Sequence, residues 1–160
     1  MNPSIPYEAL NIAANTYGTP LYVYHGEKIE SQYQNLLTHF SSKSTRFFYA
    51  CKSLTNIHIL QVVKNAGCPI DCSSINEVKL ALHVGFEPKN ILYTSNSVSF
   101  NEICEAVALG INVNIDSLSN LEKFGAKFGN KYAVGVRIRP NIMAGGNLKI
   151  STGHDKSKFG

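Results

Sequence analysis

Short apolar runs recur along this chain at intervals of about 22 residues. Their centres lie near Phe48, Ile70, Leu92, Val113 and Val136. Each run has the length of a β-strand. Between these runs lie the stretches "NIHILQVVKNAG", "INEVKLALHVG", "FNEICEAVALG" and "LSNLEKFGAKFG". Each has apolar residues at i, i+3, i+4 and i+7 and finishes with a glycine. That spacing predicts amphipathic helices with glycine C-caps, so strands and helices should alternate.

Serial strand–helix units require a parallel sheet with right-handed crossovers, which forms either a (β/α)8 TIM barrel or an open doubly wound sheet. The even spacing favours the α/β barrel, as does the lack of G-x-G-x-x-G after the first strand. A complete barrel has eight units in about 250 residues. We therefore expect residues 1–160 to form one partial barrel domain of about five units, the first part of a longer protein. The strands should end near Lys52, Ser73, Ser95, Asp116 and Arg139.

The segment before the first barrel strand is predicted to contain two helices and a further strand. A helix is expected around Ser4–Tyr17, and Gly18 and Pro20 should end it. The stretch "GTPLYVYH", residues 18–25, has the pattern of a strand. A second helix is expected over Ile29–Phe40.

The composition excludes several classes of protein. With 44% hydrophobic residues, the chain can bury one sizeable core. The N-terminal "MNPSIPYEAL" lacks the basic and apolar regions of a signal peptide, and no run reaches the roughly 18 apolar residues of a membrane helix. The four cysteines show no C-x-x-C pairing, so we expect buried reduced thiols and no metal site. The predicted setting is the cytoplasm, without a membrane partner.

Positive charge is concentrated in the last quarter of the chain. Residues 123–160 hold eight basic residues and a single acidic one, Asp155. Such an excess favours an anionic ligand. The basic residues are not interleaved with aromatic residues that could stack on bases, so no nucleic-acid partner is expected.

Polar residues follow several of the predicted strands, at the end where barrel enzymes build their active sites. In "TRFFYACKS", Lys52 ends the apolar run and shares its side of the strand with Ala50. In "CPIDCSS", Asp71 points away from its apolar neighbours. In "AVGVRIRP", Arg137 and Arg139 alternate with apolar residues that should meet the helices. We therefore expect Lys52, Asp71 and both arginines to converge on the mouth of the barrel.

A lysine in such surroundings suggests a definite chemistry. Lysine amines form Schiff bases with aldehydes, and neighbouring arginines together with desolvation favour the uncharged, nucleophilic amine. A lysine at a strand end is often merely solvated, but the carboxylate and guanidinium groups expected beside Lys52 argue for a chemical role. The pattern predicts a site for an anionic ligand that carries a carbonyl group.

Four quoted segments, taken in order, carry a resemblance to a known family. These are "YACKS", "DCSSINEVKLAL", "VRIRPNIMAGG" and "TGHDKSKFG". They resemble the cofactor-lysine segment, the second-strand motif, a later strand and loop, and the S-K-F-G segment of the fold-type III pyridoxal phosphate decarboxylases, whose barrel is of the alanine-racemase-like type. The resemblance covers residues 18–160. It departs from the family at Arg139, where Asn or Asp is usual, and at Ser74 and Ile75, where a Gly pair is frequent.

The resemblance implies a cofactor and a set of residues that bind it. The cofactor is pyridoxal 5'-phosphate, and the enzymatic activity is decarboxylation of a small amino-acid substrate. Lys52 is the implied catalytic residue, which binds the cofactor covalently. Ala50 is expected to leave room for the cofactor ring, and Asp71 and Arg137 to lie close to it.

The resemblance further implies substrate-binding elements and a larger assembly. His154, in the glycine-rich loop of residues 141–158, and Asn96, after the third strand, are candidates for contacts with substrate or for a lid. The full-length protein is expected to be a homodimer with a C-terminal β-domain. The residues that stack on the ring and hold the phosphate are expected beyond Gly160, so the isolated 160-residue fragment should be inactive.

Three interpretations of the activity stay open at this point. The loop of residues 141–158 favours the lysine-forming branch of the family over sister enzymes that act on ornithine, arginine or carboxynorspermidine. The third interpretation is a non-catalytic pyridoxal phosphate carrier on a similar barrel, which would lack that loop. A β-rich continuation with a Cys and Tyr pair would support the decarboxylases.

Overall fold

The computed structural model describes residues 5–40, 42, 44–142 and 152–154. Its helices are α1 (Tyr7–Tyr17), α2 (Gly26–His39), α3 (Ile57–Asn65), α4 (Ile75–Val84), α5 (Phe100–Ala108) and α6 (Leu118–Phe128). Its strands are β1 (Tyr49–Ala50), β2 (Ile70–Cys72), β3 (Ile91–Thr94), β4 (Asn112–Ile115) and β5 (Gly135–Val136). Two short 3-10 helices complete these elements, η1 (Cys51–Ser53) and η2 (Pro88–Asn90).

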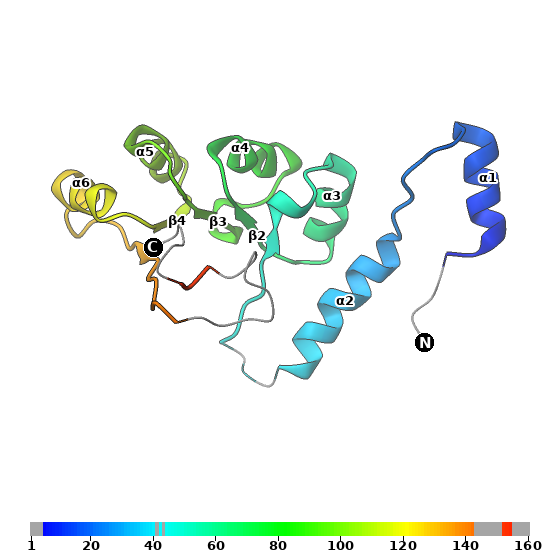
Figure 1. The fold of residues 1–160 in the computed structure, drawn as a ribbon, viewed down its shortest axis with the longest axis horizontal. Helices are drawn as coiled ribbons and strands as arrows, with labels where there is room; N and C mark the ends of the chain where they lie inside the picture. The colour runs from blue at the N-terminus through cyan, green and yellow to red at the C-terminus, as the bar shows by residue number, and fades with distance from the viewer. Residues whose placement is uncertain (1–4, 41, 43, 143–151, 155–160) are drawn as a thin grey trace.

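The five strands form one parallel sheet whose order is the order of the chain, β1-β2-β3-β4-β5. Helices α3 to α6 follow one another over the same face of that sheet (Figure 1). An open doubly wound sheet reverses its strand order and carries helices on both faces. Sequential order with helices on one side is the arrangement of a (β/α) barrel. The predicted fold, a barrel represented by five units, is confirmed.

Polar side chains fix where the four barrel helices begin. The N-cap residues each accept a backbone N–H with a side-chain oxygen, namely Asn56, Ser74, Ser99 and Ser117. At α5 the Glu102 carboxylate also accepts from the backbone of Ser99, which completes a capping box. At the end of α4, Gly85 has a φ of 93°, which favours glycine because it has no Cβ. These signals place the helices where the apolar periodicity predicts them.

The core lies between the sheet and helices α3 to α6. Alternate residues of the central strands are buried against the helices, namely Ile70 and Cys72, Ile91 and Tyr93, and Val113 and Ile115. They meet buried helix residues that include Leu60, Val78, Ile103 and Phe124. Since side chains alternate across a strand, residues adjacent to these buried ones, such as Asp71, Thr94 and Asn114, lie on the face away from the helices. That face corresponds to the interior of a barrel.

The structure of the region before the barrel confirms the sequence-based prediction only in part. Helices α1 and α2 are present, but residues 18–25 form no strand, so that prediction is wrong. A strand must pair its backbone with a neighbour, and β1 pairs only with β2 in the described sheet. Tyr22 is 89% exposed, so the segment also lacks a buried side. Helix α2 packs beside α3 (Figure 1).

None of the helices in the described part of the chain is long and apolar enough to cross a membrane.

Gly135 in β5 faces the side chain of Asn114 in β4, which fills the space that a Cβ at Gly135 would take. A Cβ at this position would overlap Oδ1 of Asn114. We expect Gly135→Ala in the full-length protein to lower the free energy of unfolding by about 1–3 kcal/mol, the usual cost of overpacking. The measurement is urea denaturation.

Gly125→Ala is the matched control for this substitution. Gly125 lies in α6, where an added Cβ meets nothing within 4 Å. Alanine there should raise the free energy of unfolding by up to about 1 kcal/mol, because it favours the helix. Equal stabilities of the two variants would contradict the close approach of β5 to β4.

Candidate active site

A row of polar side chains crosses three strands on the barrel-interior face. Asn114 donates from Nδ2 to Oγ1 of Thr94 over 3.3 Å, and Thr94 donates from Oγ1 to Oδ1 of Asp71. The strand register explains the pairing, because Thr94 lies opposite Asn114 across β3 and β4. We call Asp71, Thr94 and Asn114 the polar row. Its hydrogen bonds fix the Asp71 carboxylate from one side.

Burial and two nearby cations act on Asp71 in opposite directions. Partial burial raises the pKa of Asp71 above its ordinary value, because a charged carboxylate loses hydration there. The hydrogen bond from Thr94 and the positive charges of Lys52 and Arg137 each lower that pKa. The net direction is upward. Lys52 and Arg137 are therefore close enough to act electrostatically on the same carboxylate.

Lys52 lies in η1, immediately beyond the C-terminal end of β1. The strand ends at Ala50, so Lys52 is part of a short turn and not of the strand itself. Its side chain is exposed, whereas the adjacent Cys51 is wholly buried. The expected desolvation of Lys52 is therefore not provided by the described residues. An exposed amine at this edge is nevertheless accessible to a ligand in the barrel mouth.

Ala50 lies on the face that the alternation predicts, but the apolar neighbours of Arg137 do not meet the helices as expected, because Val136 is 52% and Ile138 79% exposed. Ala50 is the register partner of Asp71 across β1 and β2, so it lies in the strand next to the carboxylate. The backbone N–H of Arg137 donates to the carbonyl of Ile115 over 2.8 Å, which extends the pairing of β5 with β4 beyond Val136. Arg139 donates from Nε to Oδ1 of Asn141 over 3.1 Å, within its own loop.

The remaining candidates are only partly placed. Asn96 donates from Nδ2 to Oδ2 of Asp116 over 2.7 Å and so joins the ends of β3 and β4. His154 is half-buried, and most of its loop, with Lys149, Lys156 and Lys158, lies outside the described residues. Contacts of Asn96 or His154 with a substrate stay predictions.

Thr94 and Asn114 were missed at the sequence level. Both alternate with buried apolar residues in "ILYT" and "NVNI", the same pattern that identifies Asp71, so the signal was present. Side chains of adjacent strands become neighbours only once the register is known. The register then makes these two residues the support of Asp71.

The site carries chemical groups that can bind the aldehyde and the ring of a pyridoxal cofactor. An accessible amine can bond covalently to an aldehyde carbon. A carboxylate and a guanidinium group within electrostatic reach can orient the polar substituents of a ring. Lys52, Asp71 and Arg137 supply these three groups at one end of the sheet. The residues present therefore fit the aldehyde group and the ring substituents of pyridoxal phosphate.

Comparison with known proteins defines the class. Residues 26–160 match the family described as pyridoxal-dependent decarboxylase, pyridoxal binding domain. The match covers most of the chain and includes the whole five-stranded sheet. The chain belongs to the pyridoxal-dependent decarboxylase family.

Individual relatives narrow the similarity further. The chain is 38% identical over 149 residues to diaminopimelate decarboxylase from Methanothermobacter thermautotrophicus, covering 92% of this chain and 35% of that protein. A crystal structure of diaminopimelate decarboxylase from Helicobacter pylori, complexed with L-lysine, aligns with a TM-score of 0.83 at 33% identity. That alignment covers 97% of this chain and 40% of the other.

An ornithine decarboxylase is a more distant neighbour. The crystal structure from Entamoeba histolytica aligns with a TM-score of 0.69 at 28% identity, covering 82% of this chain and 41% of the other. The chain spans little more than a third of the length of the curated relatives it matches.

Proposed function

We propose that this chain forms part of an enzyme that decarboxylates meso-2,6-diaminopimelate to L-lysine and CO2 with pyridoxal 5'-phosphate. The observation that carries the proposal is the match of residues 26–160 to the pyridoxal-dependent decarboxylase family, in a fold that keeps Lys52 and Arg137 within electrostatic reach of Asp71. It is supported by the similarity to diaminopimelate decarboxylases, two of which were crystallised with L-lysine.

In the proposed enzyme, each residue of the site has a separate role. The Lys52 amine would hold the cofactor through its aldehyde carbon. Asp71 balances the positive charge at Lys52 and Arg137, and the hydrogen bond from Thr94 holds its carboxylate in place. Ala50, with only a methyl group, leaves space beside the carboxylate. When bound, the cofactor supplies an electron sink for the pair of electrons that CO2 leaves behind.

The choice among the three interpretations rests on the extent of similarity. The H. pylori diaminopimelate decarboxylase covers more of this chain, at higher identity and TM-score, than the E. histolytica ornithine decarboxylase. This difference favours the lysine-forming reaction over the sister reactions. A non-catalytic carrier is disfavoured, because the matched family is one of decarboxylases. The cytoplasmic setting, the homodimer and the C-terminal β-domain remain predictions.

Substrate preference tests the proposal. Full-length protein loaded with pyridoxal phosphate should release CO2 from meso-2,6-diaminopimelate with a kcat/KM at least about 100-fold higher than from ornithine, arginine or carboxynorspermidine. Only meso-2,6-diaminopimelate carries a second carboxylate beside its distal amine, and a site built to hold that group discriminates strongly against substrates that lack it. Preference for ornithine, arginine or carboxynorspermidine would contradict the proposal and assign the protein to a sister decarboxylase. Binding of cofactor without CO2 release from any of them would favour the carrier.

A further inference from the structure

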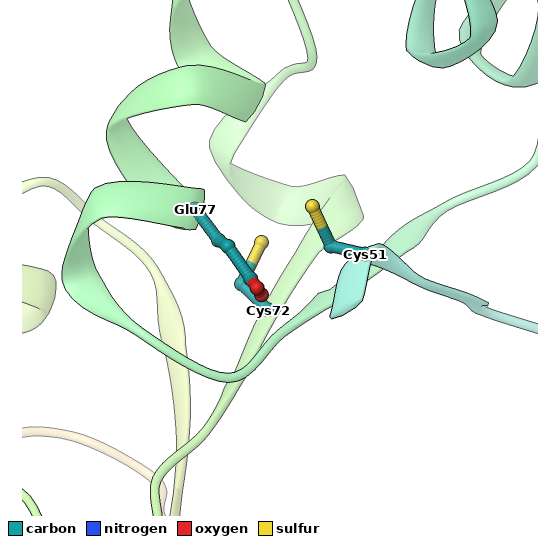
Figure 2. Close-up of side chains that lie close together, drawn as sticks. All are labelled: Cys51, Cys72 and Glu77. Carbon is teal, nitrogen blue, oxygen red and sulfur yellow. The ribbon is translucent and has the colours of Figure 1, made fainter. Parts of the chain in front are cut away.

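Two buried cysteines lie directly beneath the Lys52 turn. Ala50 and Asp71 are register partners across β1 and β2, so Cys51 and Cys72 are the next residues on the same two neighbouring segments. Both cysteine side chains are 0% exposed. Figure 2 shows them together with Glu77, which reaches the same place from the first turn of α4. The two sulfur atoms and a Glu77 oxygen all lie within 4.8 Å of one another.

Glu77 already has a structural partner in this cluster. Its Oε2 accepts the backbone N–H of Ser73 over 2.7 Å, which fixes the turn between β2 and α4. Two sulfurs and one engaged carboxylate are fewer ligands than the four of a structural zinc site. The arrangement therefore suits a reaction between the two sulfurs better than metal binding.

We propose that Cys51 and Cys72 form an oxidation site, whose product is a disulfide that holds the turn carrying Lys52. Neighbouring positions on paired strands bring Cα atoms to the separations that disulfides span. Closure must bring the sulfurs from within 4.8 Å of one another to about 2 Å, which draws Cys51 toward β2. Because Lys52 is the next residue, η1 must adjust with it.

The electrostatics of the pair support a division of roles between the thiols. Hydrogen bonding with Cys72 lowers the pKa of Cys51, while the same interaction and burial raise the pKa of Cys72. Cys51 is therefore the better nucleophile, since the thiolate is the reactive form. Glu77 and Asp71 are the nearby acidic groups that oppose ionisation of both sulfurs.

The oxidant that the reaction requires is a peroxide. The Cys51 thiolate attacks one oxygen of hydrogen peroxide, the O–O bond breaks, and a sulfenic acid and hydroxide form. The Cys72 sulfur then attacks the Cys51 sulfur, the S–O bond breaks, and the Cys72 proton leaves with the hydroxyl group as water. Two thiols lose two electrons, and peroxide is reduced to two molecules of water.

Peptide mapping of the full-length protein after treatment with hydrogen peroxide tests this site. We expect a peptide pair joined through Cys51 and Cys72, a mass loss of about 2 Da, and reversal by dithiothreitol. Cys72→Ser and Cys51→Ser should each abolish the joined pair. Cys68→Ser and Cys104→Ser are the matched controls and should retain it, because Cys68 donates to backbone carbonyls and Cys104 lies beside Lys127.

Two outcomes would overturn the proposal. One is that Cys51 and Cys72 stay reduced, or reach sulfinic acid unlinked, while Cys104 is oxidised. The other is a joined pair without slower hydrogen exchange over residues 51–54, which would show that the disulfide does not hold the turn.

The consequence for the cofactor rests on the proposed function. We expect the joined form to lose most of the visible absorption of the lysine-bound cofactor, with recovery on reduction. If Lys52 is not the cofactor lysine, the Lys52→Ala variant will keep this absorption. The peptide pair joined through Cys51 and Cys72 will still appear after peroxide treatment. Failure of the oxidation site and failure of the proposed function therefore give different results.

Discussion

Lys52→Ala in the full-length protein should abolish the visible absorption band of the bound cofactor and slow decarboxylation by about 10³-fold or more. The lost amine makes the covalent bond to the cofactor, so the variant loses a bonding partner and not merely a binding contact. Because the Lys52 side chain is exposed, the substitution should leave the fold intact. Absorption spectra and CO2 release with pyridoxal phosphate present measure both effects.

Lys89→Ala is the control for this substitution. Lys89 is also an exposed lysine in a short 3-10 helix, η2, and it forms an ion pair with Glu87 over 2.7 Å. Exposed ion pairs of this kind contribute little to stability. The Lys89→Ala variant should therefore keep the visible absorption band of the cofactor and a near-normal rate of decarboxylation. A Lys52→Ala enzyme with near-normal turnover would refute the role of this lysine.

Asp71→Asn should reduce activity and increase the stability of the cofactor-free protein. Asparagine keeps an oxygen that can accept from Thr94, but it cannot balance the charges of Lys52 and Arg137. Loss of one preorganised electrostatic group in a site costs about 10²–10³-fold in rate. Asn112→Ala serves as a control. Asn112 lies on the same face of β4 as Asn114 but outside the polar row, so this substitution should leave the rate near normal.

The effect on stability follows from the raised pKa of Asp71. The folded protein binds the Asp71 proton more tightly than the unfolded chain, so stability falls as pH rises from the ordinary value of 3.8 through the raised folded pKa. Above that window, ionised Asp71 is a net cost that the neutral amide of an asparagine does not carry.

The melting temperature of the cofactor-free Asp71→Asn variant should therefore exceed that of the wild type at pH 7. The gap should close below pH 3.8, where Asp71 is protonated in both states. Thermal melts across pH measure this, and a variant less stable at neutral pH would contradict the environment assigned to Asp71.

The barrel fold was predictable because its signals are local. Apolar periodicity gives α3 to α6, and a glycine such as Gly85 marks where a helix ends. The strand predicted over residues 18–25 failed because its pattern is also local, whereas a strand exists only where a partner lies beside it.

The candidate site was predictable one strand at a time. Alternation identifies Asp71 and Arg137, and the end of an apolar run identifies Lys52. The hydrogen bond from Thr94 to Asp71 depends on the register between strands. The proximity of Cys51 to Cys72 also depends on that register. The exposure of Lys52 depends on the turn that η1 makes after β1, which no periodic pattern encodes.

The site of covalent attachment is the central claim, and a single experiment addresses it. Full-length protein is incubated with pyridoxal phosphate, reduced with borohydride and digested, and the pyridoxyl-labelled peptide is identified by mass spectrometry. We predict the label on the peptide that contains Lys52. Label on another lysine, such as Lys149, Lys156 or Lys158, with Lys52 unmodified, would contradict the assignment of the site and the function built on it.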